Sequence, residues 1–370
     1  PGRRRRRLRL ALPAPLLLLL LLLSHPRPHP RRLPLPHHLR HHRPLPPLHP
    51  GRRPVDDLTF RAMGSSCRLV VDGPPGLAER ARATVADLEA RWSRFLPDSE
   101  VTGANRSAGQ PTVVSLPTYR LAEHALEAQR LTDGIFDPLL LDPLEALGYD
   151  RDHRRLADPG PIDGPPSPTE RSSGDGSTDD PACPRRLALD PALSAITVPA
   201  GARFDPGGIG KGLAADIVAQ DLVDQGAWWV SVELGGDLRF AGASIVAHGW
   251  TVVVEDPLDP TAELGRLSVA GGAVATSSRL RRRWNHGGRT HHHLLDPLTR
   301  ASATSAVAAA TVQSSHAWIA DVLAKCLVIG GPEQAESLLR RTGAGAVLSL
   351  EDGSIRCVGP VDLLEDARAQ

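Results

Sequence analysis

The sequence predicts an α+β fold, with mixed β-sheets and surrounding helices in a single domain over residues 56–370. Segments with apolar residues three and four positions apart alternate with short apolar runs along this whole stretch. The first pattern is typical of amphipathic helices and the second of strands, and their mixing disfavours a helical bundle or a β-sandwich. A chain of 370 residues is also long enough to bury one large core.

Five segments have the helical pattern. In residues 74–92 the apolar side chains recur at three- and four-residue spacing up to Trp92. Residues 116–134 repeat the pattern, with Pro117 near the start and Gly134 past the end, as is common at helix termini. The other helices are predicted at residues 212–225, 315–329 and 332–341.

Six short apolar runs predict strands. They are residues 68–71, 195–198, 229–233, 250–255, 266–269 and 346–350. Residues 157–184 interrupt the pattern with abundant Pro, Gly, Ser and Asp. Because helix and strand patterns resume on both sides, we interpret these residues as a disordered insertion within the domain.

Residues 1–55 differ from the rest of the chain. An arginine block and eight consecutive leucines precede a stretch rich in Pro, His and Arg. This order is typical of a signal segment, and the leucine run is short for a transmembrane helix. No small-residue cleavage site and no lipid-attachment cysteine follow it. We expect a disordered leader, either the signal or anchor segment of an extracytoplasmic, membrane-associated protein or the leader of a cytoplasmic one.

The overall charge gives little information about partners. There are 43 Lys and Arg against 42 Asp and Glu, so no overall field favours nucleic acid. Only Lys211 and Lys325 are lysines. The four cysteines lie far apart without a C-x-x-C pair, which indicates neither a zinc site nor a disulfide framework. The function must therefore be inferred from a local site.

A glycine-rich stretch, "DPGGIGKGLAAD" at residues 205–216, stands where an apolar run gives way to a predicted helix. Such a turn can present backbone N–H groups and the positive end of a helix to a phosphate. It is not a P-loop, because Asp205 replaces the first glycine and Gly212 follows the lysine. A dinucleotide fingerprint does not fit either. From these residues alone, both phosphate binding and a plain strand-to-helix turn remain open.

Eight short blocks follow one another in order: "AMGSSCRLVV", "WSRFLPDSEVTGAN", "DGIFDPL", "FDPGGIGKGLAAD", "VSVELGGDLRFAG", "AVATSSRLRRRW", "HHHLLDPLTR" and "WIADVLAKCLVIGG". In these blocks, from about Leu58 to Gly330, the sequence resembles the ApbE family of FAD:protein FMN transferases. The resemblance implies an α+β domain around a central FAD cleft. It also implies an enzyme that uses magnesium to cleave the FAD pyrophosphate, releases AMP and joins FMN through a phosphoester to a Thr or Ser of an acceptor protein.

The resemblance also assigns site residues. The positions implied to contact FAD are Met63, Phe95, Ile135, Phe136, Asp137, Asp205, Lys211 and Thr276. Gly208 matches the position whose backbone oxygen helps to hold magnesium, and Asp321 matches the metal-binding aspartate. From residue type alone, Met63 is equally a core residue, Asp137 a cap of the next segment and Lys211 a solvated charge. The arginines at 279 and 281–283 either meet the phosphates or form a solvated face.

Lys325 departs from the family pattern, which has a metal-binding threonine four residues after the aspartate at position 321. An ammonium cannot ligate magnesium, but at this spacing it can pair with Asp321 or reach the pyrophosphate in place of the metal. We therefore hypothesise that Lys325 weakens or replaces one metal position. If Lys325 instead points to solvent, its difference from the family pattern has no functional effect.

His293 matches the histidine implied to deprotonate the acceptor hydroxyl, and histidine suits a base near neutral pH. His291, His292 and His293 also form a candidate metal patch, but neighbouring residues of a strand face opposite sides. The predicted catalytic residues are therefore His293 and Asp321. The alternative is an FAD-binding protein without transfer, or an FAD pyrophosphatase. A P-loop protein is disfavoured because no hydroxyl residue follows Lys211.

Overall fold

The computed structural model describes residues 55–151, 156, 185–243, 249–259, 261–361 and 363–364, and the statements below concern these residues. Residues 1–54 of the predicted leader and the predicted insertion at 157–184 lie outside them. No helix in the described ranges is long and apolar enough to cross a membrane.

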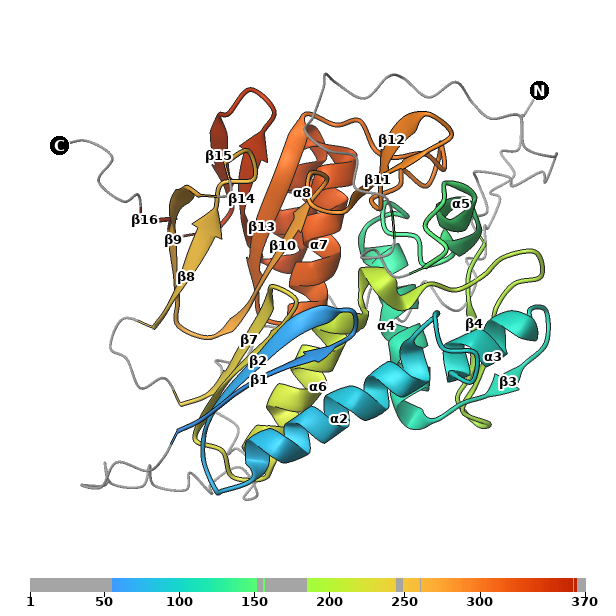
Figure 1. Cartoon of the computed structure of the whole chain (residues 1–370), viewed down its shortest axis with the longest axis horizontal. Coiled ribbons are helices and arrows are strands. Elements are labelled where there is room, and N and C mark those ends of the chain that lie inside the picture. The colour runs from blue at the N-terminus through green and yellow to red at the C-terminus, as the bar shows by residue number, and fades with distance from the viewer. Residues whose placement is uncertain are drawn as a thin grey trace, which may run out of the picture. The chain divides into compact units, whose positions relative to one another are not determined.

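An eight-stranded antiparallel sheet forms the centre of the fold (Figure 1). Its strands, in spatial order, are β1 (Asp56–Ala62), β2 (Ser65–Asp72), β6 (Trp229–Leu234), β7 (Asp237–Gly242), β10 (Gly272–Ser278), β13 (Val307–Ser314), β14 (Gly345–Leu350) and β15 (Ile355–Val358). Every neighbouring pair is antiparallel. The fold is therefore α+β, as the sequence predicts.

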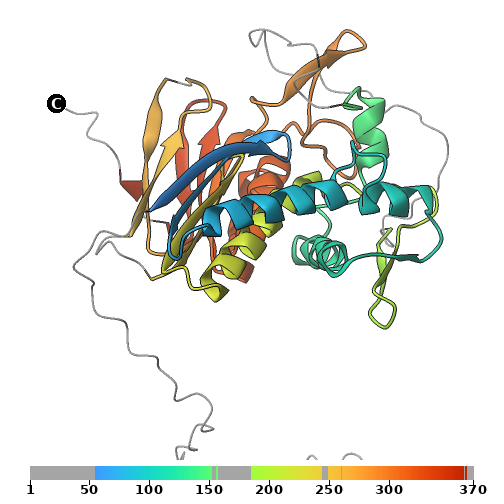
Figure 2. The ribbon, with the colours of Figure 1, turned by 60° about the horizontal axis from the view of Figure 1, so that its bottom comes forward.

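Helices cover one face of this sheet. They are α2 (Leu77–Trp92), α6 (Gly210–Asp224) and α7 (Ala317–Gly330), with α8 (Pro332–Thr342) following α7. Figure 2 shows α2 and α6 side by side beneath the strands. α7 is apolar around most of its circumference and packs on β10 and β13, where it lies in the main core. The two charged residues of α7, Asp321 and Lys325, are therefore buried.

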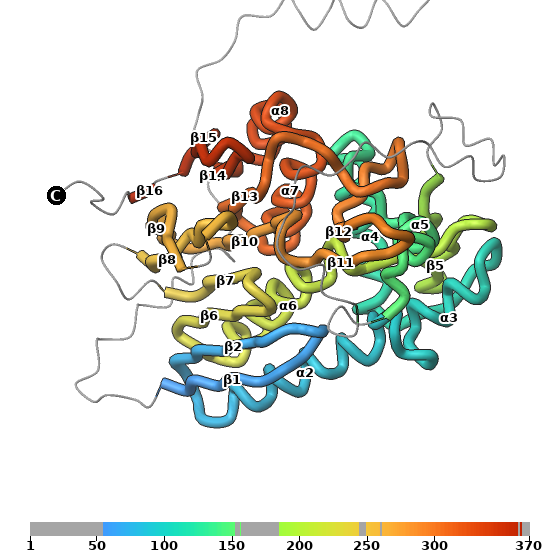
Figure 3. Tube along the Cα trace, turned by 45° about the horizontal axis from the view of Figure 1, so that its top comes forward, coloured from blue at the N-terminus to red at the C-terminus, as the bar shows by residue number. Residues whose placement is uncertain are grey.

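The opposite face of the sheet carries a second, smaller core. A three-stranded sheet of β16 (Leu363–Leu364), β9 (Glu263–Val269) and β8 (Trp250–Glu255) lies over it (Figure 3). Successive residues of β10 point to opposite sides, so Ala273 and Ala275 enter the main core while Val274 enters the second. The described domain thus has three layers: helices, the eight-stranded sheet and the three-stranded sheet.

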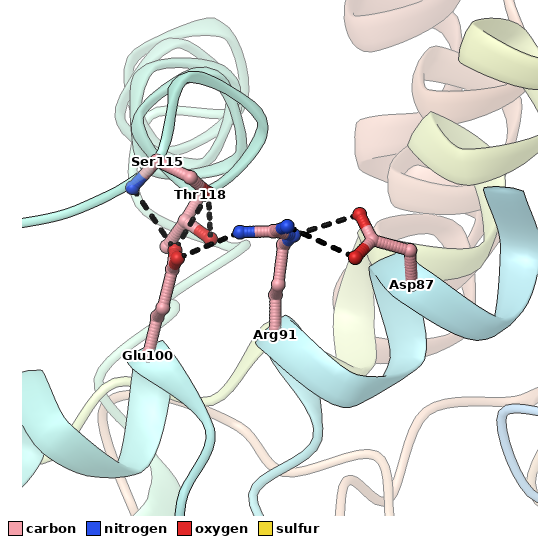
Figure 4. A network of polar contacts seen from close by, with 5 residues as sticks. All are labelled: Asp87, Arg91, Glu100, Ser115 and Thr118. Carbon is pink, nitrogen blue, oxygen red and sulfur yellow. Dashed lines mark hydrogen bonds and ion pairs between the residues drawn. The ribbon is translucent and has the colours of Figure 1, made fainter.

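The remaining elements gather at one end of the main sheet. They are α3 (Glu100–Arg106), β3 (Thr112–Val113), α4 (Leu116–Leu131), α5 (Leu141–Ala146), β4 (Ala188–Asp190), β5 (Ala195–Thr197), β11 (Arg283–His286) and β12 (Arg289–His292). Figure 4 shows how Arg91 at the end of α2 joins Asp87 to Glu100 of α3. Glu100 in turn accepts hydrogen bonds from the backbone N–H and the hydroxyl of Ser115, before α4. This network fixes both ends of the loop at residues 93–99.

All five predicted helices and all six predicted strands are present, with ends within three residues of those predicted. The sequence patterns did not predict β1, β7, β10 or β13.

Candidate functional site

The glycine-rich stretch forms a single 3-10 turn, Pro206–Gly208, that leads into α6. Asp205 caps this turn, since its carboxylate accepts a hydrogen bond from the Gly207 N–H at 2.9 Å. Asn105 of α3 holds the preceding residue at two points: its amide donates to the Phe204 carbonyl at 2.9 Å and accepts from the Phe204 N–H at 2.7 Å. These hydrogen bonds fix the position of the turn and therefore the direction of its N–H groups.

Gly212 allows α6 and α7 to approach closely. A Cβ at this position would lie 2.5 Å from the backbone oxygen of Ala317, so no other residue fits without a shift. The Gly212 N–H faces Asp321 Oδ2 at 3.4 Å. Asp216, one turn further along α6, accepts hydrogen bonds from the first two N–H groups of α7 at 3.0 and 2.9 Å. The first turn of α6, which directly follows the glycine turn, and Asp321 therefore lie side by side.

Two lysine–aspartate pairs lie at this helix contact. Lys211 pairs with Asp237 of β7, and Lys325 pairs with Asp321. Lys325 also approaches the backbone oxygen of Asp321 at 3.3 Å and is only 9% exposed. Lys325 thus points inward, and the alternative of a solvent-facing side chain is excluded. Asp237 was missed from the sequence, although it lies within one of the quoted blocks.

Lys211 and Asp321 hold each other in their charged forms, whereas the surroundings of Asp237 disfavour its charged form. Burial opposes the charged form of Lys211, but the carboxylates of Asp237 and Asp321 hold its pKa above the ordinary value. Burial likewise opposes ionisation of Asp321, yet Lys325 and Lys211 hold the pKa of Asp321 below its usual range. Burial and the neighbouring Asp321 carboxylate raise the pKa of Asp237. Asp321 is therefore an ionised carboxylate between two ammonium groups.

Two cavities meet at this cluster. The glycine-loop cavity, of about 980 Å³, is lined by ten of the predicted residues, and seven of them line this cavity alone: Met63, Phe95, Ile135, Phe136, Asp137, Asp205 and Gly208. The sheet cavity, of about 950 Å³, is lined by Asp321 and Thr276. We call the residues that line both cavities the junction; they are Gly207, Lys211, Arg282, His293 and Lys325. Of the other positions implied to contact FAD, only Lys211 shares the sheet cavity with Thr276.

Backbone strain and tight packing shape the glycine-loop cavity. Met63 has a φ of 50° in the two-residue turn between β1 and β2, a conformation that is costly for a side-chain-bearing residue. A Cβ on Gly208 would lie 2.6 Å from the Phe136 ring, so the ring packs directly on the turn. Asp137 accepts a hydrogen bond from the Leu139 N–H at 2.9 Å, so it caps the next segment while lining the cavity.

Arg94 also lines the glycine-loop cavity and was missed from the sequence. Its guanidinium lies between the rings of Phe95 and Tyr149, 4.5 and 4.7 Å from their centroids. Its Nε is 3.8 Å from the Asp205 carboxylate, whereas its buried Nη1 has no hydrogen-bond partner among the described residues. A buried donor without a partner is costly unless a ligand satisfies it. The arginine within the quoted "WSRF" block was the available signal.

His293 follows β12 and is half-buried at the junction. Burial, together with the positive charge of Arg282, lowers its pKa well below the ordinary value. Its Nδ1 is buried and has no hydrogen-bond partner in the described structure. His293 is therefore neutral near pH 7 and has a ring nitrogen available for proton transfer.

The other two histidines of the run do not share this position. His291 Nε2 lies 3.3 Å from the backbone oxygen of His286, and His292 Nε2 lies 3.0 Å from that of Ala303. Within the described ranges, no three His, Cys, Asp or Glu side chains are grouped to hold a metal ion. The candidate three-histidine metal patch is therefore not formed.

The side chains around Asp321 do not fit a magnesium ion bound through Asp321 and residue 325. The Lys325 ammonium donates a hydrogen bond to Oδ1 of Asp321, and the Gly212 N–H donates one to Oδ2. Lysine has no lone pair to offer a metal while it is charged. Two ammonium groups already offset the two carboxylates of the cluster. Magnesium use stays a prediction.

Comparisons with a family model, with curated proteins and with solved structures all indicate the same family. A family model described as "ApbE family" matches residues 63–348. An FAD:protein FMN transferase of Rhodobacter capsulatus is 25% identical over 316 residues, which are 80% of this chain and 56% of that protein. One of Treponema pallidum is 28% identical over 295 residues, or 73% of this chain and 77% of that protein. The ApbE protein of Thermotoga maritima has a crystal structure with a TM-score of 0.69 at 27% identity, covering 82% of this chain and 97% of that one. This chain therefore spans little more than half of the Rhodobacter protein.

Proposed function

The chain belongs to the ApbE family, and we propose that it is an FAD:protein FMN transferase, which cleaves the FAD pyrophosphate and transfers FMN to a Thr or Ser hydroxyl of an acceptor protein. The observation that carries this proposal is the junction. There a neutral histidine with a free ring nitrogen and two buried ammonium groups lie between two cavities. This arrangement suits a transfer reaction between two substrates, whereas a binding protein has no need of it.

The glycine-loop cavity is the proposed FAD site. Its volume of about 980 Å³ is at the upper end of that of cofactor pockets, about 300–1,000 Å³. Phe95 is 46% exposed and offers an aromatic face to the flavin or the adenine. Arg94 Nη1 offers a donor to an anionic or carbonyl oxygen. The N-terminus of α6 contributes partial positive charge where the pyrophosphate would lie.

In the proposed reaction His293 accepts the proton of the acceptor hydroxyl. The hydroxyl oxygen then attacks the phosphorus of the FMN half, and the bond from that phosphorus to the bridging oxygen breaks. AMP leaves with the bonding electrons. His293 can return its proton to AMP or to water, which balances the step. General-base help of this kind typically contributes about 10²- to 10⁴-fold in rate.

Lys211 and Lys325 offer N–H donors to the pyrophosphate and offset the Asp237 and Asp321 carboxylates, which would otherwise repel it. At about 4 Å and an effective dielectric constant near 20, one unit charge attracts a phosphate charge by about 4 kcal/mol before desolvation. A lysine therefore provides about half the attraction of a divalent ion at the same distance. Magnesium, when it takes part, would add charge stabilisation of the same kind at the phosphate oxygens.

Residues 1–54 lie outside the described structure, so export and membrane association through the leader stay predictions.

The test is incubation of the protein with FAD, magnesium chloride and a candidate acceptor carrying a single Thr or Ser, followed by intact-mass analysis. We expect an FMN-sized gain in acceptor mass and release of AMP. His293→Ala should lose the gain but keep FAD binding, measured by flavin fluorescence. FMN and AMP without acceptor labelling would favour the pyrophosphatase alternative. FAD binding without turnover would favour the non-transferring alternative.

A further inference from the structure

The floor of the sheet cavity is the helix-free face of the eight-stranded sheet. On β2, β6 and β7 it is lined by Val70, Ser231 and Phe240, which are direct cross-strand partners in that order. On β10 and β13 it is lined by Thr276 and Thr311, which are also partners. Cross-strand partners point to the same side of a sheet, so the cavity is a broad groove across several strands.

The wall of this groove is the edge of β8. All six residues of Trp250–Glu255 line the cavity. Successive side chains of a strand point to opposite faces, so a cavity that contacts all six must run along the edge of the strand. β8 pairs with β9 on one side, and no described strand pairs with its other edge. An edge of this kind offers a row of unpaired backbone donors and acceptors.

We propose that the sheet cavity binds an extended segment of the acceptor protein, which pairs with the free edge of β8 and delivers its Thr or Ser hydroxyl to the junction. This inference rests on the proposed transferase function. The reaction has two substrates, and the two cavities share the residues at which those substrates must meet. FAD in the glycine-loop cavity leaves the sheet cavity as the route for the acceptor.

The chemistry of the groove favours a polypeptide occupant. Repeated backbone pairing along six residues, which span about 20 Å, is available to a peptide strand and not to a flavin or a lipid. The floor alternates hydroxyl side chains, such as Ser231 and Thr311, with apolar ones, such as Val70 and Phe240. Of the basic side chains that line the cavity, Arg68, Lys211, Arg281 and Lys325 are paired with carboxylates, so charge alone does not select the segment.

The first test narrows the groove at Ser231, a floor residue that is not part of the junction. Ser231→Trp places a large ring on the floor, while Ser231→Ala keeps the groove open. Ser107→Trp is the matched control, because Ser107 is exposed and lines neither cavity. The probe is a set of peptides of about twelve residues, twice the length of β8. Each has one Thr flanked by Ala, Val and Asp. We expect Ser231→Trp to lower the kcat/KM for FMN transfer to these peptides roughly tenfold or more, with an unchanged Kd for FAD.

The second test addresses backbone pairing directly. One labelled peptide is synthesised in two forms, N-methylated at alternate positions on one edge or on the other. Only one edge of a strand can pair with β8, so one form should lose transfer while the other retains it. Equal loss or equal retention in the two forms would contradict pairing with β8.

The outcomes separate this inference from the proposed function. If the wild type turns over FAD but labels none of the peptides, or if Ser231→Trp labels them as well as the wild type, the groove assignment is wrong. Loss of FAD binding in Ser231→Trp, with Ser107→Trp unaffected, would place FAD in the groove. That result would also overturn the assignment of the groove to the acceptor. If the wild type does not turn over FAD at all, the transferase function itself fails.

Discussion

Replacing Lys325 with threonine removes the ammonium group that pairs with Asp321 and introduces a hydroxyl oxygen. Asp321 is 1% exposed and lies on the wall of the sheet cavity, so its carboxylate loses its ion-pair partner in a largely buried position. Breaking a buried ion pair by removing one partner typically costs about 3–5 kcal/mol. For a domain of this size such a loss corresponds to a fall in Tm on the order of 10 °C.

Magnesium should then restore the thermal stability that Lys325→Thr loses with the ammonium group. A divalent ion at the Asp321 carboxylate and the new hydroxyl would satisfy both groups, as oxygen ligands suit magnesium. We expect the Tm of Lys325→Thr to rise with magnesium chloride concentration while the wild-type Tm stays nearly flat. Turnover of FAD by the variant should also require more magnesium than turnover by the wild type.

The assay is thermal unfolding followed across a magnesium titration, with FAD turnover measured at the same concentrations. Lys325→Met is the matched control, because it removes the charge but offers no oxygen ligand. Its Tm should fall as in Lys325→Thr and should not recover with magnesium. Identical magnesium titrations of the wild type and Lys325→Thr, in both Tm and turnover, would refute the idea that Lys325 replaces a metal position.

Three further predictions concern single side chains. His293→Gln should slow FMN transfer by about 10²- to 10⁴-fold with little change in the Kd for FAD, measured by flavin fluorescence. Arg94→Ala should weaken FAD binding about tenfold or more, since the buried Nη1 is available to a charged ligand. Burial lowers the pKa of His292 to about 4, so the free energy of unfolding should fall as pH drops from about 6.5 to 4, by about 3 kcal/mol from this residue.

Each of these has a distinguishing control. The sign for His292 follows because the unfolded chain binds the proton first, and a His292→Gln variant should lack this part of the pH dependence. Transfer by His293→Gln at the wild-type rate would exclude His293 as the base. For Arg94, Arg94→Lys keeps the charge but not the planar guanidinium, so it should recover only part of the FAD affinity. Unchanged affinity in Arg94→Ala would show that Arg94 has a structural role only.

One of the strands that the sequence patterns did not predict, β13, is buried along almost its whole length. β13 reads "VAAATVQS", and alanine favours helices, so its local preference contradicts its structure. It is a strand because α7 covers one face and β10 and β14 pair with its edges. The small side chains let α7 pack closely, which is a property of the tertiary fold and not of the segment.

The site was predictable where its residues follow one another in a motif. The resemblance assigns Asp205, Lys211 and Asp321, and the structure packs α6, which carries Lys211 and follows the turn capped by Asp205, against α7, which carries Asp321. Asp237 was missed because its role depends on β7 packing beside α6, and no spacing in the sequence reports that contact. The inward direction of Lys325 was likewise an open alternative until its partner was seen.

The lysine composition has a practical consequence. Of the 370 residues only two are lysines, and both place their side-chain amines in the junction. Every other basic side chain, apart from histidine, is a guanidinium, which amine-selective reagents leave unmodified. Isotope-labelled lysine would therefore give a spectrum with two side-chain signals, each reporting on the junction without any background from the protein surface.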